Sequence, residues 1–201
     1  MPRNWLLLFL LCLMVLIACD FCWIQDCSDA EEEEYACSEC NFQLTALTQA
    51  YNQKEWRDLS CCLSDQFTFY FNPADSIYVS FTFPDLQLDR DQELDILKNM
   101  FENAPSISLT LSGDRVMSYS GDPTGESKLL PRSYDLTVFL ADGVGYRIGG
   151  ECHFVVAPED GTYKIVQWQD LSSSSASIIK EDGIRDVEND KSWGYVKWIF
   201  R

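Results

Sequence analysis

Residues 134–171 constrain the fold most, because they have the pattern of two consecutive β-hairpins. Apolar and polar residues alternate through the first two strands, which is typical of strands with one buried face. Asp142-Gly143 and residues 158–161 suit the tight turns between the strands, and Trp168 lies on the third strand. Three long antiparallel strands with one apolar face need other elements to cover it. We therefore expect helices from the rest of the chain to pack on this face.

The chain before these strands is predicted to supply the covering helices. Residues 44–51 carry apolar side chains at helical spacing, which predicts a first helix. Asn52 and Glu55 have the spacing of a capping box, so this helix should end near Asn52 and a second helix should begin. Trp56 and Leu59 start the apolar stripe of that second helix.

Strand and helix signals alternate in the next part of the chain. Phenylalanines recur at every second position in residues 66–71, which indicates a strand. Residues 72–88 are typical of a loop, in which 77–83 could add an edge strand. Asp89-Arg90-Asp91-Gln92 predicts the cap of a third helix. A further strand is expected from residue 107 onwards.

These patterns divide the 201 residues into four parts, of which one is a folded domain of the α+β class. Residues 1–18 are expected to be a signal peptide and residues 19–41 an acidic tether. Residues 42–171 form the domain, and residues 172–201 are an extension packed on it. Residues 172–190 are polar and are expected to form a surface loop. Residues 192–201 carry two tryptophans and a phenylalanine, so we expect them to dock on the domain as a short helix or strand.

The charge of the chain argues against a nucleic-acid partner. The formal net charge is −17, from 15 basic and 32 acidic residues. Such a surface repels phosphate backbones and anionic lipid headgroups. The charge therefore favours solubility or a basic partner. Residues 31–34 are four consecutive glutamates, whose mutual repulsion should keep the tether extended.

Residues 1–19 have the form of a targeting segment. Arg3 precedes an unbroken apolar run over residues 6–17, which is too short for a comfortable transmembrane helix. The run ends in Leu16-Ile17-Ala18-Cys19, which resembles a bacterial lipobox. This resemblance implies cleavage before Cys19 and lipidation of its thiol, with palmitate among the acyl chains. It also implies a lipid-anchored, periplasm-facing location in the bacterial cell envelope, at the inner or the outer membrane.

The cysteines do not form a recognisable metal or redox site. Nine are present; Cys12 leaves with the signal and Cys19 is lipidated, so seven remain and at least one lacks a partner within the chain. Cys37 and Cys40 form a C-x-x-C pair. A zinc ribbon needs a second such pair, and a thioredoxin-like site needs a βαβ unit. We therefore expect linker disulfides or idle thiols, no metal and no cofactor.

The predicted order of elements resembles a known family. A broken helix, a strand, a helix and four antiparallel strands are the order of the nuclear transport factor 2-like fold, the cone-shaped α+β family that includes ketosteroid isomerases, scytalone dehydratase and polyketide cyclases. The likeness covers residues 42–171 and is carried by residues 47–56, 63–68 and 163–170. With the lipobox and a closing Ser192-Trp193-Gly194…Lys197, the chain resembles bacterial envelope lipoproteins of this fold.

The resemblance implies that any chemistry takes place in an apolar pocket inside the cone. The isomerases use an Asp base, with a Tyr and a protonated acid, and no position here matches this set. The strongest polar group is Arg147, Glu151 and His153, which share one face of a strand. If that face lined the cone, His153 could act as a general base oriented by Glu151. The competing interpretation turns apolar side chains inward and this trio towards water or a dimer partner.

Two further groups of residues are candidates. Asp65 and Asp170 are acids that could reach the pocket, or else cap turns and bond to loop backbone. Aromatic residues on the strands either line a ligand cavity or form plain core: Phe67, Phe69, Phe71, Tyr134 and Trp168.

Two functions stay open on the sequence alone. The favoured one is a membrane-tethered, non-catalytic domain that binds an envelope protein or a small apolar ligand, with a homodimer through the sheet as one arrangement. The alternative is a small cofactor-independent isomerase or lyase that acts on an apolar ligand inside the cone. An open pocket with two or more convergent polar groups would favour the enzyme, and a filled cone would rule against it.

Overall fold

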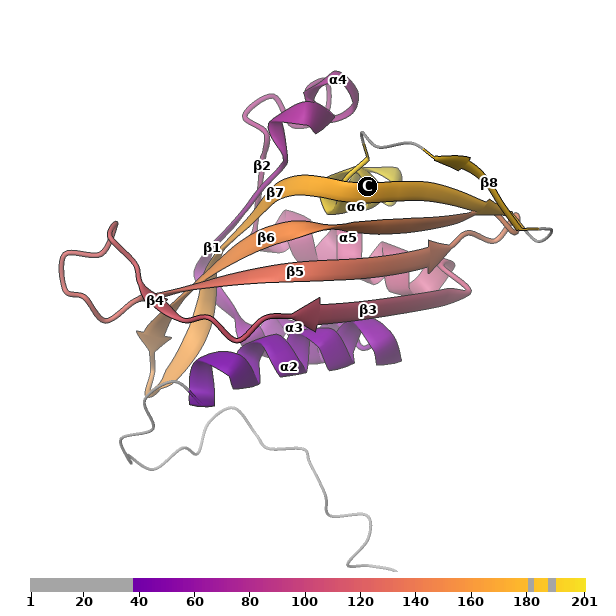
Figure 1. Cartoon of the computed structure of the whole chain (residues 1–201). Helices are drawn as coiled ribbons and strands as arrows, with labels where there is room; N and C mark the ends of the chain where they lie inside the picture. Colours follow the sequence, from indigo (N-terminus) through magenta and orange to yellow (C-terminus); the bar gives the residue numbers. More distant parts are fainter. Residues whose placement is uncertain (1–37, 181–182, 188–190) are drawn as a thin grey trace, which may run out of the picture. The chain divides into compact units, whose positions relative to one another are not determined.

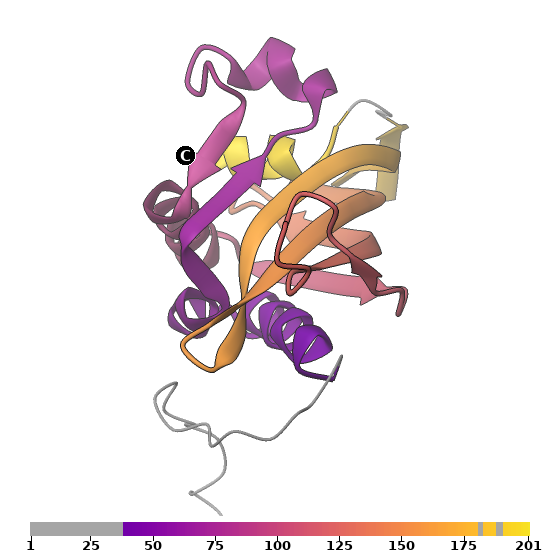
Figure 2. The same cartoon turned by 90° about the vertical axis from the view of Figure 1, so that its left-hand side faces the viewer.

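The computed structural model describes residues 38–180, 183–187 and 191–201 (Figure 1). The predicted signal peptide, the lipidated Cys19 and the tether up to residue 37 lie outside the described residues. Within the described part, the chain is an α+β domain in which helices pack on one curved sheet. Figure 2 shows the sheet bending around the helices, so that one face is concave and the other is convex. We call the space on the concave side the cone.

Eight strands of the described part form this sheet, through seven strand pairings. The order is β2-β1-β7-β6-β5-β3, with β4 paired to β5 and β8 paired to β7. Strand β1 runs parallel to β7, and every other pair is antiparallel. The strands are β1 (Leu63–Tyr70), β2 (Gln87–Asp89), β3 (Ser106–Ser112), β4 (Met117–Ser118), β5 (Lys128–Phe139), β6 (Gly145–Glu159), β7 (Thr162–Lys180) and β8 (Gly183–Val187).

The two hairpins predicted from the sequence are confirmed. Strands β5 and β6 are joined through Gly143, and strands β6 and β7 through Asp160 and Gly161. All three turn residues have positive φ angles, of 80°, 51° and 81°. Glycine adopts this conformation without steric cost, and Asp tolerates it better than most residues. These local turns set the registers that bring the inward-facing positions of three strands together.

The prediction of a surface loop from residue 172 is wrong, because β7 continues to Lys180 and β8 follows it. The backbone of Ser173 pairs with Gly150 and that of Ser175 with Gly149, where the register shifts. Serine has little intrinsic preference for strands, so the sequence gives a loop signal here. The long neighbouring strand β6 supplies backbone partners that override this preference.

Five α-helices and one short 3-10 helix belong to the described residues, and α6 packs against α4, α5, β6 and β7. Figures 1 and 2 show α2, α5 and α6 on the concave side of the sheet. The helices are α2 (Ser38–Gln53), α3 (Trp56–Cys62), η1 (Pro73–Asp75), α4 (Ser76–Val79), α5 (Arg90–Asn103) and α6 (Trp193–Ile199).

The predicted break between α2 and α3 is present, but its predicted cause is wrong. Asn52 does not cap α3, whose N-cap position is Glu55 with no side-chain bond. The Asn52 amide instead pairs with the backbone of Leu109 on β3: Nδ2 donates to the carbonyl at 3.0 Å and Oδ1 accepts from the N–H at 2.8 Å. Lys54 takes a positive φ of 59° between the two helices. Asn52 therefore joins α2 to the edge strand of the sheet.

The start of the domain also differs from the prediction. Helix α2 begins at Ser38, four residues before the predicted boundary, and Cys40 is buried in the core. Asn41 accepts a hydrogen bond at 2.6 Å from Arg132 of β5, whose guanidinium also donates to the carbonyl of Arg115. The last residues of the predicted tether are therefore part of the folded domain.

The segment 72–88 was predicted as a loop in which 77–83 could add an edge strand, but residues 73–79 are helical and no strand forms over 77–83. Residues 73–75 are η1 and 76–79 are α4, and β2 starts only at Gln87. The predicted cap of α5 is confirmed, because Asp89 accepts from the backbone of Gln92 while the Gln92 side chain accepts from the backbone of Asp89. The prediction that residues 192–201 dock as a short helix or strand is confirmed by α6.

Candidate functional site inside the cone

A polar cluster lies deep in the cone, centred on Asp170 of β7. Asp170 is fully buried, and its Oδ1 accepts a hydrogen bond at 3.2 Å from the hydroxyl of Tyr134 on β5. Both side chains point inward because they occupy concave-face positions of their strands. Asp170 was predicted either as an acid near the pocket or as a partner of loop backbone. Its Oδ2 accepts at 2.8 Å from the backbone N–H of Gly194, in the first turn of α6.

Ser192 links Asp170 to a second buried carboxyl group, that of Asp75 at the end of η1. Ser192 Oγ is 2.6 Å from Asp170 Oδ2 and also contacts Asp75 Oδ2. The Ser192 hydroxyl has one proton, which it can donate to only one of the two carboxyl groups. Its contact with the other carboxyl group is favourable only if that group is itself protonated. Burial raises the pKa of Asp170, which agrees with a proton being retained in this cluster. The cluster thus fixes the start of α6 to β7 and η1.

Gly194 is required at its position by lack of space. A Cβ atom there would lie 2.6 Å from Cδ1 of Phe71 and 3.1 Å from Oδ2 of Asp75. The glycine lets the backbone approach closely enough for its N–H to reach Asp170. The first turn of α6 is therefore pressed against Phe71, which follows β1, and against Asp75 of η1.

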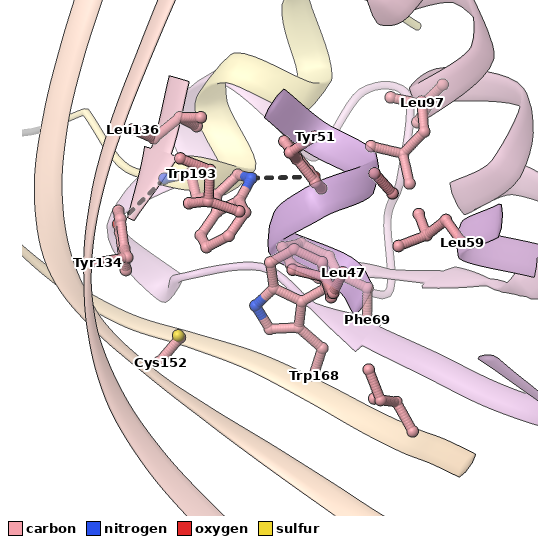
Figure 3. Close-up of a cluster of buried hydrophobic side chains, with 14 of the residues drawn as sticks. Leu47, Tyr51, Leu59, Phe69, Leu97, Tyr134, Leu136, Cys152, Trp168 and Trp193 are labelled. Carbon is pink, nitrogen blue, oxygen red and sulfur yellow. Dashed lines mark hydrogen bonds between the residues drawn. The ribbon is translucent and has the colours of Figure 1, made fainter. Parts of the chain in front are cut away.

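Trp193 fills the middle of the cone (Figure 3). Its indole N–H donates to the hydroxyl of Tyr51 on α2 at 3.2 Å, and its backbone N–H donates to the hydroxyl of Tyr134 at 3.2 Å. Its ring centroid lies 4.3 Å from that of Trp168 and 5.3 Å from that of Tyr51, in edge-to-face contacts. Buried tryptophans generally need a partner for the N–H, and Tyr51 provides it here.

Lys197 and Glu93 form an ion pair in which both side chains are 0% exposed. Lys197 Nζ lies 2.6 Å from Glu93 Oε1 and 3.5 Å from the ring centroids of Phe69 and Trp168. Burial lowers the pKa of the Lys197 ammonium to about 8 and raises the pKa of the Glu93 carboxyl. Desolvation therefore outweighs the attraction within the pair, as is common for buried ion pairs.

The aromatic candidates from the sequence surround this cluster. Phe67, Phe69, Tyr134 and Trp168 are all buried, and Trp168 contacts the rings of Phe69, Tyr51 and Phe154. Trp168 points to the concave side, where it meets Phe69 of β1 and Tyr51 of α2. Tyr134 and Trp168 contact the ring of Trp193 of α6, and Phe69 contacts Lys197, so in this conformation the aromatic candidates form core.

The trio Arg147, Glu151 and His153 lies on the convex face, away from the cone. Arg147 and Glu151 are exposed, while the alternating residues between them are buried. Arg147 forms a two-pronged contact with Asp135 on β5, with Nη2 and Oδ2 2.8 Å apart. The hypothesis of His153 as a general base inside the cone is therefore wrong. Apolar side chains take the concave face because burial favours them there.

Glu151 and His153 line a shallow outer groove of about 400 Å³ instead. Arg115 from the segment after β3, Met117 of β4 and Ser133 of β5 also line it. The groove carries both signs of charge. Within the residues that the structure describes, no group of three or more His, Cys, Asp or Glu side chains could hold a metal ion.

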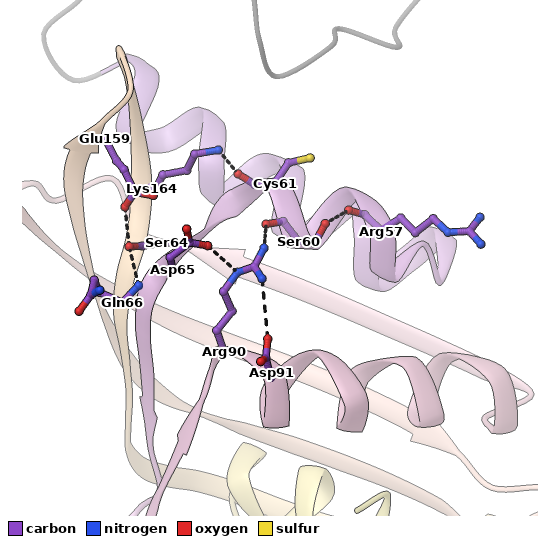
Figure 4. Close-up of polar contacts among 10 residues, drawn as sticks. All are labelled: Arg57, Ser60, Cys61, Ser64, Asp65, Gln66, Arg90, Asp91, Glu159 and Lys164. Atoms are coloured by element: carbon purple, nitrogen blue, oxygen red, sulfur yellow. Dashed lines mark hydrogen bonds and ion pairs between the residues drawn. The ribbon is translucent and has the colours of Figure 1, made fainter.

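Asp65 lies at the surface rather than at the mouth of a pocket (Figure 4). Its side chain is 86% exposed, and Oδ1 is 3.7 Å from Nε of Arg90. Arg90 also donates to the carbonyl of Ser60, while Lys164 of β7 donates to the carbonyl of Cys61. These contacts fasten the junction of α3 and β1 to α5 and β7. Asp65 therefore has a peripheral position with no route to the polar cluster.

Three residues of the cluster escaped the sequence analysis. Asp75, Glu93 and Lys197 are buried charges, and none was named as a candidate for the cone. Glu93 had a usable signal, because it lies one turn before Leu97 and so shares the apolar face of its helix. A glutamate on such a face usually needs a buried partner. Asp75 had no comparable signal, since it lies in a segment read as loop.

Comparisons with known proteins support the fold. No family model matches the sequence, and no curated protein matches it either. Among solved structures, a conserved protein from Planctomyces limnophilus is similar with a TM-score of 0.54 and 9% identity, over 71% of this chain and 94% of that one. Hexachlorocyclohexane dehydrochlorinase LinA-type3 from Novosphingobium barchaimii has a TM-score of 0.55 and 8% identity, over 71% and 88% of the two chains.

A protein from Kribbella flavida gives a TM-score of 0.55 at 12% identity, over 69% of this chain and 90% of that one. Such neighbours share a cone-shaped arrangement of helices on a curved sheet. This domain has the nuclear transport factor 2-like fold. At these identities the likeness concerns the fold alone, and the nuclear transport factor 2-like fold hosts enzymes and binding proteins alike. The function must therefore be argued from the contents of the cone.

Proposed function

We propose that this protein is a non-catalytic ligand- or protein-binding module, tethered to the bacterial cell envelope by lipid on Cys19. The observation that carries this proposal is the filling of the cone by α6. Trp193 and Lys197 are fully buried where the resemblance places the apolar pocket of the family enzymes. A substrate would have to displace α6 before reaching Asp170 or Tyr134. Acid–base catalysis requires hydrogen-bond reach between the catalytic group and the substrate.

The polar groups of the cone support the same conclusion, because the chain itself occupies them. Asp170 accepts from Tyr134, Ser192 and Gly194, and Glu93 is paired with Lys197. A catalytic site normally leaves such groups directed at a place where a reacting atom can sit. Here they hold α6 in position. Their role in this conformation is structural.

Binding at the outer surface is supported by charge and by shape. The net charge of −17 favours a basic partner through electrostatic steering. The outer groove offers a concave surface in which Glu151 and Arg115 present both signs of charge. An envelope protein with a matching polar surface is the partner class that fits these features.

The tether is proposed from the sequence. The segment Leu16-Ile17-Ala18-Cys19 supports lipidation, and the acidic residues that follow suit an extended spacer. None of the helices in the described ranges combines the length and apolar character that a bilayer crossing requires.

Detergent phase partitioning after expression in a bacterium tests the tether. The full-length protein should enter the detergent phase, and Cys19→Ala should leave an unprocessed or soluble form. Cys22→Ala serves as a matched control, because it removes a nearby thiol outside the lipobox and should partition as the wild type does. Normal processing and unchanged partitioning of Cys19→Ala would overturn the lipid anchor.

A dye titration tests the closed cone. The wild-type domain should show no saturable fluorescence enhancement with anilinonaphthalene sulfonate under native conditions. Trp193→Ala, which removes the ring that fills the cone, should show more binding and serves as the positive control. Saturable binding to the wild type would favour the alternative, a small cofactor-independent isomerase or lyase. The hydrogen-bonded pair Tyr134–Asp170 is the one observation that favours this alternative.

A further inference from the structure

The ammonium group of Lys197 sits in a cage of aromatic rings and a carboxylate. Its Nζ lies 3.5 Å from the centroids of Phe69 and Trp168, 5.9 Å from that of Trp193, and 2.6 Å from Glu93 Oε1. Aromatic faces within about 6 Å attract a cation electrostatically, and more so when the cation is desolvated. The cage therefore has the parts of a cation-binding site, and a side chain of the same chain occupies it.

The walls of the cage do not depend on Lys197 for their position. Phe69 lies on β1 and packs edge-to-face on Phe71, with centroids 5.1 Å apart. Trp168 lies on β7, in contact with Phe69 at 5.3 Å and with Phe154 at 5.0 Å. None of these contacts involves the side chain of Lys197, and the further contact of Trp168 with Trp193 of α6, at 4.3 Å, does not involve it either. Removal of the lysine side chain should therefore leave an intact space rather than a collapsed one.

The cage also retains unused hydrogen-bonding capacity. Glu93 Oε2 and Trp168 Nε1 are buried and have no hydrogen-bond partner among the residues that the structure describes. A primary ammonium group has three N–H donors, and Lys197 directs one of them at Glu93 Oε1. A ligand that is not held by the backbone of α6 could reorient to use both carboxylate oxygens.

The chemistry selects the type of cation. A quaternary ammonium has no N–H to donate, so it cannot satisfy a buried carboxylate, which is costly to leave unpaired. A neutral alcohol has no charge to compensate Glu93. A primary alkylammonium supplies the charge, the donors and an apolar stem for the surrounding rings.

We propose that the cone contains a binding site for a primary alkylammonium group, defined by Phe69, Trp168 and Glu93, which Lys197 of α6 occupies in cis. A free primary alkylammonium can occupy this site once the Lys197 side chain is removed. The inference goes beyond the proposed function, because it concerns the interior of the cone and holds with or without a lipid anchor.

Chemical rescue of Lys197→Ala tests the site. This substitution removes the equivalent of n-propylammonium, so n-propylammonium chloride is the probe. The unfolding temperature of the variant should rise by roughly 5–10 °C at a concentration about 100-fold above Kd, relative to the same concentration of sodium chloride. The wild type, whose cage is occupied, should not shift. Circular dichroism follows the unfolding.

Matched variants and probes make the result specific. Lys197→Met fills the space of the stem without a charge, and Lys197→Ala combined with Glu93→Gln removes the carboxylate; neither should respond to propylammonium. Neither 1-propanol nor tetramethylammonium should rescue Lys197→Ala. Equal shifts in these controls, or no shift in Lys197→Ala, would overturn the proposal.

A folding defect of Lys197→Ala still gives a decision. If the variant is unfolded alone, refolding with propylammonium should recover the native near-ultraviolet signal of the buried tryptophans, and no recovery would count against the site.

The outcome of the rescue experiment is independent of the outcome of the tests of the proposed function. A failed rescue leaves the phase-partitioning and dye experiments unaffected, and a saturable dye signal in the wild type does not predict the outcome of the rescue.

Discussion

The indole rings of Trp168 and Trp193 meet edge to face in the cone, with centroids 4.3 Å apart and an interplanar angle of 83°. Trp168 belongs to β7 and Trp193 to α6, and both are fully buried. This contact joins the sheet to the helix that fills its concave side. It is the reason that the aromatic residues of the strands form core in this domain.

Trp168→Ala should destabilise the domain by about 3–5 kcal/mol, because it removes a large buried ring and leaves a cavity. That loss is comparable to the whole stability of many domains. Urea unfolding followed by circular dichroism measures it. Trp198→Ala, on the partly exposed side of α6, is the control and should cost less. A midpoint of Trp168→Ala close to that of the wild type would contradict the core assignment.

Gly194→Ala should cost about 1–3 kcal/mol, the range for overpacking a filled core. The added Cβ would lie 2.6 Å from the ring of Phe71. The combination with Phe71→Leu should recover part of the loss, because it removes the ring that clashes. Thermal unfolding of the two single variants and the double variant provides the measurement. Strictly additive losses would show that the clash is not the cause.

The stability of the wild type relative to Lys197→Met should increase as the pH rises from about 8 towards 10. Burial lowers the pKa of Lys197 to about 8 in the folded state, whereas the unfolded chain keeps the proton to a higher pH. The unfolded state therefore binds more protons in this window, and the folded state gains stability as the pH rises. Denaturant midpoints of both proteins across this range measure the difference. Parallel curves would refute the lowered pKa.

Asn52→Ser should destabilise the domain by about 1 kcal/mol, the usual net value of hydrogen bonds lost from a folded protein. Serine is a good N-cap residue, so it would be tolerated if Asn52 capped α3. It cannot span both backbone groups of Leu109, which the asparagine amide does. Gln53→Ser, at the exposed neighbouring position, is the control. Equal and small effects of both substitutions would restore the capping interpretation.

A chain beginning at residue 42 should be less stable than one beginning at residue 38 by about 1–3 kcal/mol, because the guanidinium of Arg132 would lose its partly buried hydrogen bond to Asn41. The buried Cys40 is lost as well. Thermal unfolding of the two chains tests this expectation. Asn41→Ala in the longer chain should reproduce part of the loss. Equal stability would place the domain boundary where the sequence pattern put it.

Local signals predicted the local parts of the structure correctly. The turn through Gly143 and the capping box of Asp89 and Gln92 depend on residues within a few positions of each other. Asn52 shows the limit of this reasoning, because its spacing to Glu55 imitates a cap while its partner is 57 residues away. The serines of β7 show the same limit, since their strand conformation depends on β6.

The contents of the cone were the least predictable part for the same reason. Glu93 and Lys197 are 104 residues apart in the sequence, and Ser192 and Asp75 are 117 apart. A pattern with a period of two or of 3.6 residues shows which face is buried, but not which distant side chain meets it. The buried aromatic Trp168 could be predicted because its neighbours on the same strand already indicate the face.

The parallel pairing of β1 with β7 has a consequence for the order of folding. Strand β1 is complete at Tyr70, but its partner does not begin until Thr162, and the helix that fills the space beside them begins at Trp193. Contacts between such distant segments form slowly, because a long loop must close before they stabilise the chain. A growing chain therefore carries Phe67 and Phe69 without their final neighbours until α6 has been synthesised. Chaperone protection of β1 should matter most during that interval.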